Sequence, residues 1–193
     1  RYLYIFWKTY WFGFNGKITI FMHNMDLTPD YWQKRYKDSS TGWDIGGVST
    51  PLKTYFDQIN NKNLRILIPG CGNAYEAAYL VENGFTNVFF LFWAMAPLDQ
   101  FKHQYPAFPD EQLICANFFE HTGQYDLIVE QTFFCALNPS LRPNYAEHVF
   151  NLLQKNGKLM GLLFNIPLNA DNPPFGGNKA EYLAYFEPWF HIL

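Results

Sequence analysis

Short apolar runs alternate with helical patterns along most of this chain. The runs that read as strands are nearly all apolar and occupy residues 64–68, 88–93, 113–118, 125–129 and 158–164. Runs of this length and side-chain branching are typical of parallel strands buried on both faces. Helical patterns lie between them, including residues 51–59 and 142–153, and Asn156-Gly157 predicts a turn before the last run. Strands alternating with helices predict an α/β fold with a doubly wound, mostly parallel sheet.

Residues 64–84 read LRILIPGCGNAYEAAYLVENG and form the most informative stretch. An apolar strand ends at Pro69, a tight turn follows, and residues 74–81 predict a helix closed by Gly84. Strand, glycine turn and helix form the first unit of a nucleotide-binding βαβ fold, because glycine lets the backbone approach a ligand and the helix N-terminus offers unpaired N–H groups. The turn consists of four small residues, Gly70, Cys71, Gly72 and Asn73.

The chemistry of this turn restricts the ligand. The third glycine of a dinucleotide fingerprint is missing and Ala74 stands near its place, and there is no lysine of a phosphate-binding P-loop. These features favour an uncharged or cationic nucleoside over a pyrophosphate. An ordinary strand-to-helix turn in another kind of α/β protein remains an open alternative.

Composition narrows the class of protein further. The 193 residues are 49% hydrophobic and 16% charged, enough for the core of one domain. A formal net charge of −3 supplies no basic footprint, so we expect no nucleic-acid partner. The three cysteines lie in apolar surroundings without metal-ligand spacing, which predicts reduced core thiols in a cytoplasmic protein and no metal: Cys71, Cys115 and Cys135.

Residues 1–21 differ from the rest because they are strongly aromatic. Lys8, Gly13 and Lys17 interrupt the apolar run, which is therefore too short to span a bilayer, and no secretory cleavage site follows. We expect no membrane association. We also expect a single domain over residues 22–193, with 1–21 as an extension of doubtful relevance. From Asp26 onward the composition is that of an ordinary globular domain. Thr28 and Pro29 predict the cap and the first position of a helix.

Six segments, in the same order, resemble the thiopurine S-methyltransferase family. They are WQKRYKDSSTGWDIGGVSTPLKTY, ILIPGCGNAYEAAYL, QYDLIVEQTFFCAL, NPSLRPNY, GKLMGLLF and NPPFGG, within residues 26–193. The resemblance implies a Rossmann-like class I methyltransferase fold and S-adenosyl-L-methionine as cofactor. It also implies a small soft nucleophile as methyl acceptor: a thiol, a thiopurine or a halide.

The resemblance also assigns a cofactor site. Trp32 matches a tryptophan that closes over the cofactor, and an aromatic face attracts a sulfonium cation by about 0.5–2 kcal/mol. Trp43 and Asp44 lie in a loop that resembles a lid over the substrate and cofactor. The turn of Gly70, Cys71, Gly72 and Asn73 matches the segment under the methionine part. A core aromatic for Trp32 and a turn former for Asp44 are the alternatives.

Catalytic residues and an acceptor pocket follow from the same resemblance. Arg142 matches an arginine at the active-site rim that serves cofactor and chemistry, with a solvated first-turn residue as the alternative. Asp44, and more weakly His121, could draw a proton from the acceptor. Phe133 and Phe134 would wall an apolar acceptor pocket, although core residues would show the same pattern. The implied reaction is an in-line displacement that needs orientation more than a strong base.

Two positions depart from the family pattern. Phe92 stands where the family has an acidic residue that grips the ribose hydroxyls, and Asn117 stands where it has an aspartate that accepts from the adenine amino group. The amide oxygen of Asn117 can still accept that bond. Loss of the carboxylate at Phe92 should cost about 1.5–3 kcal/mol, about tenfold to hundredfold in cofactor affinity.

The carboxyl-terminal strands form a second departure. The family fold ends with an antiparallel hairpin whose last strand inserts between the fifth and sixth. Residues 189–193 resemble the sixth strand and no further strand follows, so the sheet would lack its last strand and the fifth strand would have an open edge. We hypothesise that residues 3–7 fill the position beside residues 158–164.

Three functions compete on these observations. The first is an active S-adenosylmethionine-dependent methyltransferase acting on a small soft nucleophile. The second is a degenerate relative that binds but does not methylate, which Phe92 and the open edge favour. The third is another nucleoside-binding α/β enzyme, which the missing phosphate motif disfavours. For the first we expect a monomer whose partners are small molecules.

Overall fold

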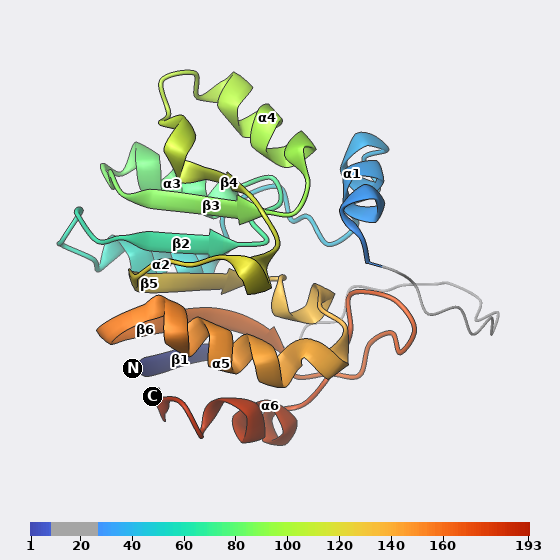
Figure 1. Ribbon diagram of the computed structural model, residues 1–193. Helices are drawn as coiled ribbons and strands as arrows, with labels where there is room; N and C mark the ends of the chain where they lie inside the picture. Colours follow the sequence, from blue (N-terminus) through green and yellow to red (C-terminus); the bar gives the residue numbers. More distant parts are fainter. Residues whose placement is uncertain (9–26) are drawn as a thin grey trace.

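A computed structural model describes residues 1–8 and 27–193 of the chain. Its centre is a seven-stranded sheet in the order β4-β3-β2-β5-β6-β1-β7, and every ladder in it is parallel (Figure 1). The predicted α/β fold with a doubly wound parallel sheet is confirmed. The strands are β1 Tyr2–Lys8, β2 Ile66–Pro69, β3 Val88–Phe92, β4 Leu113–Cys115, β5 Tyr125–Gln131, β6 Leu153–Phe164 and β7 His191–Ile192.

Helices cover both faces of this sheet. The α-helices are α1 Pro29–Lys37, α2 Thr50–Asp57, α3 Tyr75–Glu82, α4 Met95–Gln104, α5 Arg142–Leu152 and α6 Lys179–Phe186. The short 3-10 helices are η1 Asp110–Gln112, η2 Phe118–Glu120, η3 Phe134–Ala136 and η4 Pro139–Leu141. Among the described residues, no helix is both long enough and apolar enough to cross a membrane.

The pleat of the strands divides the buried residues between two cores. In β2, Ile66 and Ile68 join the core under α2, α3 and α4, whereas Leu67 joins the core under α5 and α6. Alternate residues of a strand point to opposite faces, so a fully apolar strand can serve two helical layers. Helix α1 is separate from these layers and lies beyond the carboxyl ends of the central strands (Figure 1).

The N-terminal strand occupies the position next to β6. Tyr2–Lys8 pairs in parallel with residues 158–164, and Tyr2 and Leu3 pair on their other side with His191 and Ile192. The hypothesis that residues 3–7 fill this position is therefore confirmed. The rest of the aromatic extension, residues 9–21, lies outside the described residues. Both ends of the chain meet at this side of the sheet (Figure 1).

Several predicted boundaries shift in the structure. Strand β6 begins at Leu153, earlier than predicted, but its continuous ladders start at Lys158, directly after a register irregularity at which Asn156 has the left-handed φ of +66° that the Asn156-Gly157 pattern predicts. The third predicted strand ends early at Cys115, and Asn117 caps η2 instead. Thr28 caps α1 as predicted, because its side chain accepts from the Tyr31 N–H at 3.3 Å.

Candidate functional site

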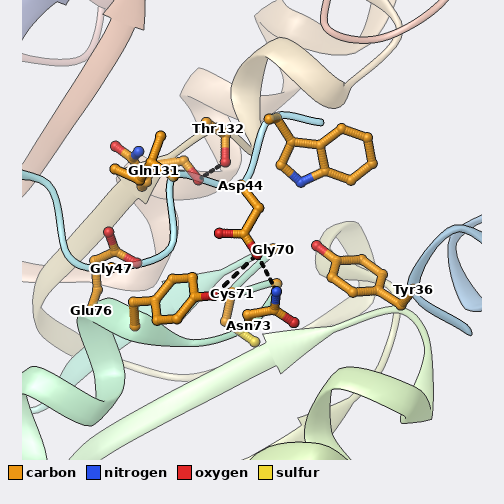
Figure 2. Close-up of a pocket in the computed structure, with 13 residues that line it drawn as sticks. Tyr36, Asp44, Gly47, Gly70, Cys71, Asn73, Glu76, Gln131 and Thr132 are labelled. Carbon is orange, nitrogen blue, oxygen red and sulfur yellow. Dashed lines mark hydrogen bonds between the residues drawn. The ribbon is translucent and has the colours of Figure 1, made fainter. Parts of the chain in front are cut away.

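Two adjoining cavities open at the carboxyl ends of β2, β3 and β5. The larger has a volume of about 520 Å³ and the smaller about 40 Å³, and Tyr36, Gly70 and Thr132 line both. Ligands of open parallel sheets bind at this edge. The smaller cavity (Figure 2) is also lined by Trp43, Asp44, Ile45, Gly47, Cys71, Gly72, Asn73, Tyr75, Glu76 and Gln131.

The glycine turn is required by the aromatic rings packed on it. Gly70 and Gly72 have φ values of +62° and +52°. A Cβ atom would lie 2.4 Å from the Phe133 ring at Gly70 and 2.6 Å from the Tyr36 hydroxyl at Gly72. A side chain at either place would therefore be strained and would displace an aromatic wall of the site. The packing of Phe133 and Tyr36 at these positions therefore depends on glycine at 70 and 72.

Asp44 holds its loop onto the glycine turn. Its Oδ1 accepts from the Gly46 N–H at 2.7 Å, and its Oδ2 accepts from the Asn73 amide and from the Tyr75 hydroxyl at 3.2 Å (Figure 2). The structure thus brings together three predicted site residues, Trp43, Asp44 and Asn73. The bond to Gly46 is that of a turn former, and the bonds to Asn73 and Tyr75 make the same carboxylate an anchor for the loop.

Helix α1 supplies an aromatic face to both cavities. Trp32 lines the larger cavity and meets Trp43 edge to face with ring centroids 5.9 Å apart. Tyr36, one turn further along α1, meets Phe92 edge to face at 5.1 Å. Burial raises the pKa of the Tyr36 phenol, which therefore stays protonated at neutral pH. Sequence reasoning overlooked Tyr36, although its spacing of four from Trp32 on a predicted helix signals a shared face.

The cysteines differ in exposure. Cys71 lines the smaller cavity and is buried, and burial raises the pKa of its thiol, so it is a neutral small residue of the turn. Cys135 is also buried, but Cys115 is exposed on the edge strand β4, so the prediction that all three are core thiols is wrong for Cys115. None of the three forms a disulfide.

Phe92 is the last residue of β3, and Asn117 lies shortly after the end of β4. Both residues line the larger cavity. Phe92 is only 7% exposed. The Asn117 side chain is engaged in its own turn, since its oxygen accepts from the Phe119 N–H at 3.1 Å and its amide donates to Glu120 at 3.1 Å. That oxygen has a second lone pair for a ligand.

The two predicted pocket phenylalanines separate. Phe133 lines the larger cavity beside Gly70, whereas Phe134 is buried against Tyr145 and Tyr182 and is not among the residues that line either cavity. The chain turns sharply here, and Thr132 has a φ of +63°. Neither a regular strand nor a regular helix continues through a residue with a positive φ, so the periodicity of the sequence does not reveal which way Phe133 and Phe134 face.

Glu130 holds that sharp turn, and sequence reasoning did not single it out. Its buried Oε1 accepts from the backbone N–H groups of Phe133 and Phe134 at 2.9 and 3.0 Å. Its Oε2 accepts from the Tyr145 hydroxyl at 2.8 Å. Burial and the nearby carboxylate raise the pKa of Tyr145. Glu130 therefore fixes Phe133 in place from behind the cavity.

Arg142 lies outside the lining of both cavities. It is 1% exposed, pairs with Glu181 at 3.1 Å, and donates to the carbonyl oxygens of Phe175 and Gly176 at 3.3 and 3.0 Å. These bonds attach α5 to α6 and to the loop before α6. Phe175 in turn donates its N–H to the Cys135 carbonyl, next to the cavity wall.

His121 is also absent from the lining of both cavities. Its Nε2 lies 2.7 Å from the Tyr125 hydroxyl, and burial followed by the nearby His148 lowers its pKa. The imidazole ring is therefore neutral at physiological pH, and its Nε2 is engaged in a hydrogen bond with the buried Tyr125.

Charge is divided unevenly between the two cavities. The smaller one is lined by the carboxylates of Asp44 and Glu76. None of the described residues that line the larger one carries a charge. Besides the residues already placed there, the larger cavity is lined by Leu27, Leu91, Trp93, Ala116, Phe118, Phe119, Ala136, Leu137, Asn138, Leu141 and Asn144.

Comparison with known proteins identifies the fold and the family. A solved structure of Burkholderia thailandensis 1,6-didemethyltoxoflavin-N1-methyltransferase with bound 1,6-didemethyltoxoflavin and S-adenosylhomocysteine has a TM-score of 0.66 at 14% identity, covering 83% of this chain and 74% of that one. Together the sheet and the cavities at its carboxyl edge define a class I methyltransferase fold.

The thiopurine S-methyltransferase family model matches residues 27–193, and the chain belongs to that family. Among its relatives, the probable thiol methyltransferase 2 of Arabidopsis thaliana is 28% identical over 156 residues, covering 78% of this chain and 69% of the relative. The thiopurine S-methyltransferase of Methylococcus capsulatus is 24% identical over 191 residues, covering 86% and 84%. The protein is an S-adenosylmethionine-dependent methyltransferase.

The larger cavity fits an adenosyl group in size, and the smaller one places carboxylates beside it. The larger is uncharged and within the range of about 300–1,000 Å³ typical of small-molecule sites, as an adenosyl group requires. The smaller offers Asp44 and Glu76 as acceptors for an ammonium group. Tyr36, at the junction of the two, presents an aromatic ring where a sulfonium cation would lie. Phe92, for which the family resemblance predicts an acidic residue, lines the larger cavity with an apolar ring.

Proposed function

We propose that this protein transfers a methyl group from S-adenosylmethionine to the sulfur of a small, uncharged, apolar thiol by in-line displacement. The observation that supports this proposal most is the uncharged 520 Å³ cavity, which begins at the glycine turn and continues past Phe133 to Leu141 and Asn144. It is larger than an adenosyl group needs. The remainder supplies room for an acceptor with apolar surface.

The proposed work of the chain is to position the two reactants and exclude water. When bound, the cofactor supplies an activated methyl group on a good leaving group. Trp32 and Tyr36 would cover the sulfonium side, and Asp44 would keep the loop closed over it through Asn73 and Tyr75. Orientation of this kind can supply about 7–11 kcal/mol of a barrier.

Deprotonation of the acceptor needs little help in this proposal. A thiol of ordinary pKa near 8.5 is already partly ionised at neutral pH. Asp44 is one of the two carboxylates among the described residues that line the smaller cavity, but the three hydrogen bonds that it accepts suit an anchor better than a base. We therefore propose Asp44 as a residue that closes the site.

The lining of the cavity also separates the candidate acceptors. A halide or another small anion would need a cation or several hydrogen-bond donors. The described lining offers no charged side chain, and its donors are neutral amide, indole and hydroxyl groups among a majority of apolar side chains. An apolar thiol, with a thiopurine as one example, is favoured over a halide. The relatives named thiol and thiopurine methyltransferases are consistent with this choice, whereas the thiocyanate methyltransferase 1 of Arabidopsis thaliana, 27% identical over 180 residues, is named for an anion.

The test combines cofactor binding with methyl transfer. Calorimetry should show S-adenosylmethionine binding to the full chain, and mass spectrometry should detect methyl transfer to thiophenol at a higher rate than to iodide. Trp32→Ala should weaken cofactor binding about tenfold or more through loss of the aromatic face. Trp189→Ala is the matched control, because Trp189 packs on Phe150 in the other half of the molecule and should leave binding unchanged.

A second candidate is a binding domain that does not methylate, and Phe92 is the observation that favours it. Cofactor binding with no methylation of any thiol or halide would support that candidate. A preference for iodide over thiophenol would contradict the proposed acceptor. Absence of cofactor binding would contradict both candidates.

Cellular context is also a proposal. Cysteines without disulfides support a cytoplasmic protein, and the net charge of −3 supports partners other than nucleic acids. We propose a monomer that acts on small molecules.

A further inference from the structure

Phe92 lines the larger cavity at the position where the family pattern has the acidic residue that grips the ribose hydroxyls. It ends β3, next to β2 and its glycine turn, and its ring contributes to the wall of the larger cavity. Tyr36 fixes the orientation of that ring, because the two meet nearly perpendicular, at 86°, with centroids 5.1 Å apart. Two rings in this arrangement form an apolar wall that cannot accept a hydrogen bond from a hydroxyl as a carboxylate does.

The neighbouring polar groups do not replace the missing carboxylate. The Asn117 amide nitrogen donates to Glu120, and its oxygen, which already accepts from the Phe119 N–H, has one lone pair left, so it cannot accept from two hydroxyls as a carboxylate does. Thr132 donates its hydroxyl to the Gln131 carbonyl at 2.6 Å. The carboxylates of Asp44 and Glu76 line only the smaller cavity. In the described lining of the larger cavity, no side chain is placed as a charged acceptor for two hydroxyls.

Water can reach this end of the cavity. Trp93 follows Phe92 directly, lines the same cavity and is 39% exposed. Hydroxyl groups beside these two residues would keep hydrogen bonds to solvent, so their burial would carry no unpaired-group penalty. Sugar hydroxyls would then contribute little to the difference in free energy between bound and free ligand.

We infer that this chain recognises its adenosyl ligand without reading the ribose hydroxyls, and that Phe92, oriented by Tyr36, determines this relaxed specificity. The inference rests on the proposed function, because it concerns the cofactor's own site. Phe92 packs on the C–H face of the sugar, and the adenine and sulfonium ends supply the affinity. The site therefore accepts adenosyl sulfonium and thioether ligands that lack the 2′ or the 3′ hydroxyl.

A site built to hydrogen-bond a hydroxyl rejects the analogue without it strongly, whereas an apolar wall discriminates weakly. This difference gives a direct test by calorimetry with S-adenosylhomocysteine and its 2′-deoxy and 3′-deoxy forms. For the unmodified chain, the three dissociation constants should agree within about threefold. For Phe92→Asp, S-adenosylhomocysteine should bind about tenfold more tightly than either deoxy form, a difference of about 1.4 kcal/mol.

Two further variants separate the roles of the rings. Phe92→Leu keeps an apolar wall without a ring, so all three ligands should weaken by a similar factor and the ratios should stay near one. Tyr36→Phe keeps the edge-to-face contact and removes the hydroxyl, so the ratios should also stay near one. Thermal unfolding of each variant shows whether it folds. The comparison within the unmodified chain needs no variant at all.

The outcomes distinguish the inference from the function that it extends. Tight binding of S-adenosylhomocysteine with about tenfold or greater loss for a deoxy form would overturn the inference and leave the proposed function intact. Loss of that discrimination in Tyr36→Phe would then assign it to the Tyr36 hydroxyl. No binding of any of the three ligands, by the unmodified chain or by Phe92→Asp, would overturn the proposed function and the inference together.

Discussion

The two halves of the sheet are built in different ways. Strands β4, β3, β2 and β5 form the half that carries both cavities. Consecutive βα units join β2 to β3 and β3 to β4, and the chain then returns from β4 to place β5 beside β2. Strands β6, β1 and β7 form the other half, in which the N-terminal strand lies between two segments from the far end of the chain. The first half is organised by local units and the second by contacts between distant segments.

This difference decides where the predicted site residues lie. The glycine turn, Phe92 and Asn117 follow strands of the first half and line a cavity as the pattern suggests. Arg142 begins α5 and belongs to the second half, where it holds α6 and the loop of Phe175 and Gly176. The first half supplies most of the lining of both cavities, α5 of the second half adds Asn144, and Arg142 supports the wall from outside.

The largest loss of stability is expected where β1 pairs with β6 and β7. Leu3 is 1% exposed and lies between β6 and β7, so Leu3→Ala should lower the free energy of unfolding by about 2–5 kcal/mol. Phe6→Ala on the same strand is the control, because Phe6 is 50% exposed and its truncation should cost less than about 0.5 kcal/mol. Urea unfolding measures both. Equal effects would show that β1 is not packed into the sheet.

A smaller loss of stability is expected when Arg142 is replaced. Arg142→Met leaves two carbonyl oxygens and Glu181 without their donor, and should cost about 3 kcal/mol, less than a fully buried pair because Glu181 is 31% exposed. Glu181→Gln should cost less, because the amide oxygen still accepts from the guanidinium. Binding of S-adenosylhomocysteine to folded Arg142→Met should change less than about twofold. Unchanged stability with lost binding or turnover would instead place Arg142 in the catalytic machinery.

The smallest expected effect on stability is at the glycine turn, where the effect on binding should be larger. Gly70→Ala introduces a side chain at a φ of +62° and should cost about 1–2 kcal/mol of stability. The new methyl group also displaces Phe133 toward the cavity, so the affinity for S-adenosylhomocysteine should fall about tenfold. Gly47→Ala is the matched control, because Gly47 lines the smaller cavity with open space around its Cα. Equal affinities of the two variants would contradict the role assigned to Gly70.

The sequence alone determined the class of fold and predicted that its candidate site lies at the glycine turn, which lines both cavities in the structure. Apolar runs at strand length, the helix cap at Thr28 and the strand-glycine-helix unit are local signals, because they depend on hydrogen bonds and burial within a few residues. They predicted β2, β3, β5 and the turn at Gly70 within one to a few residues. The sequence also revealed that Phe92 replaces the acidic residue of the family pattern, because this depends only on which residue stands at the end of one strand.

Only the tertiary structure decided which side chains meet. It brought Tyr36 onto Gly72 and Phe92, sent Phe134 into the core while Phe133 faced the cavity, and buried Arg142 against Glu181. It also extended β6 back to Leu153, which pairs with Tyr125 before the irregularity at Asn156 and Gly157. Packing between elements distant in sequence outweighs local preference at such positions, because a few kcal/mol of burial exceeds the fraction of a kcal/mol that propensity supplies.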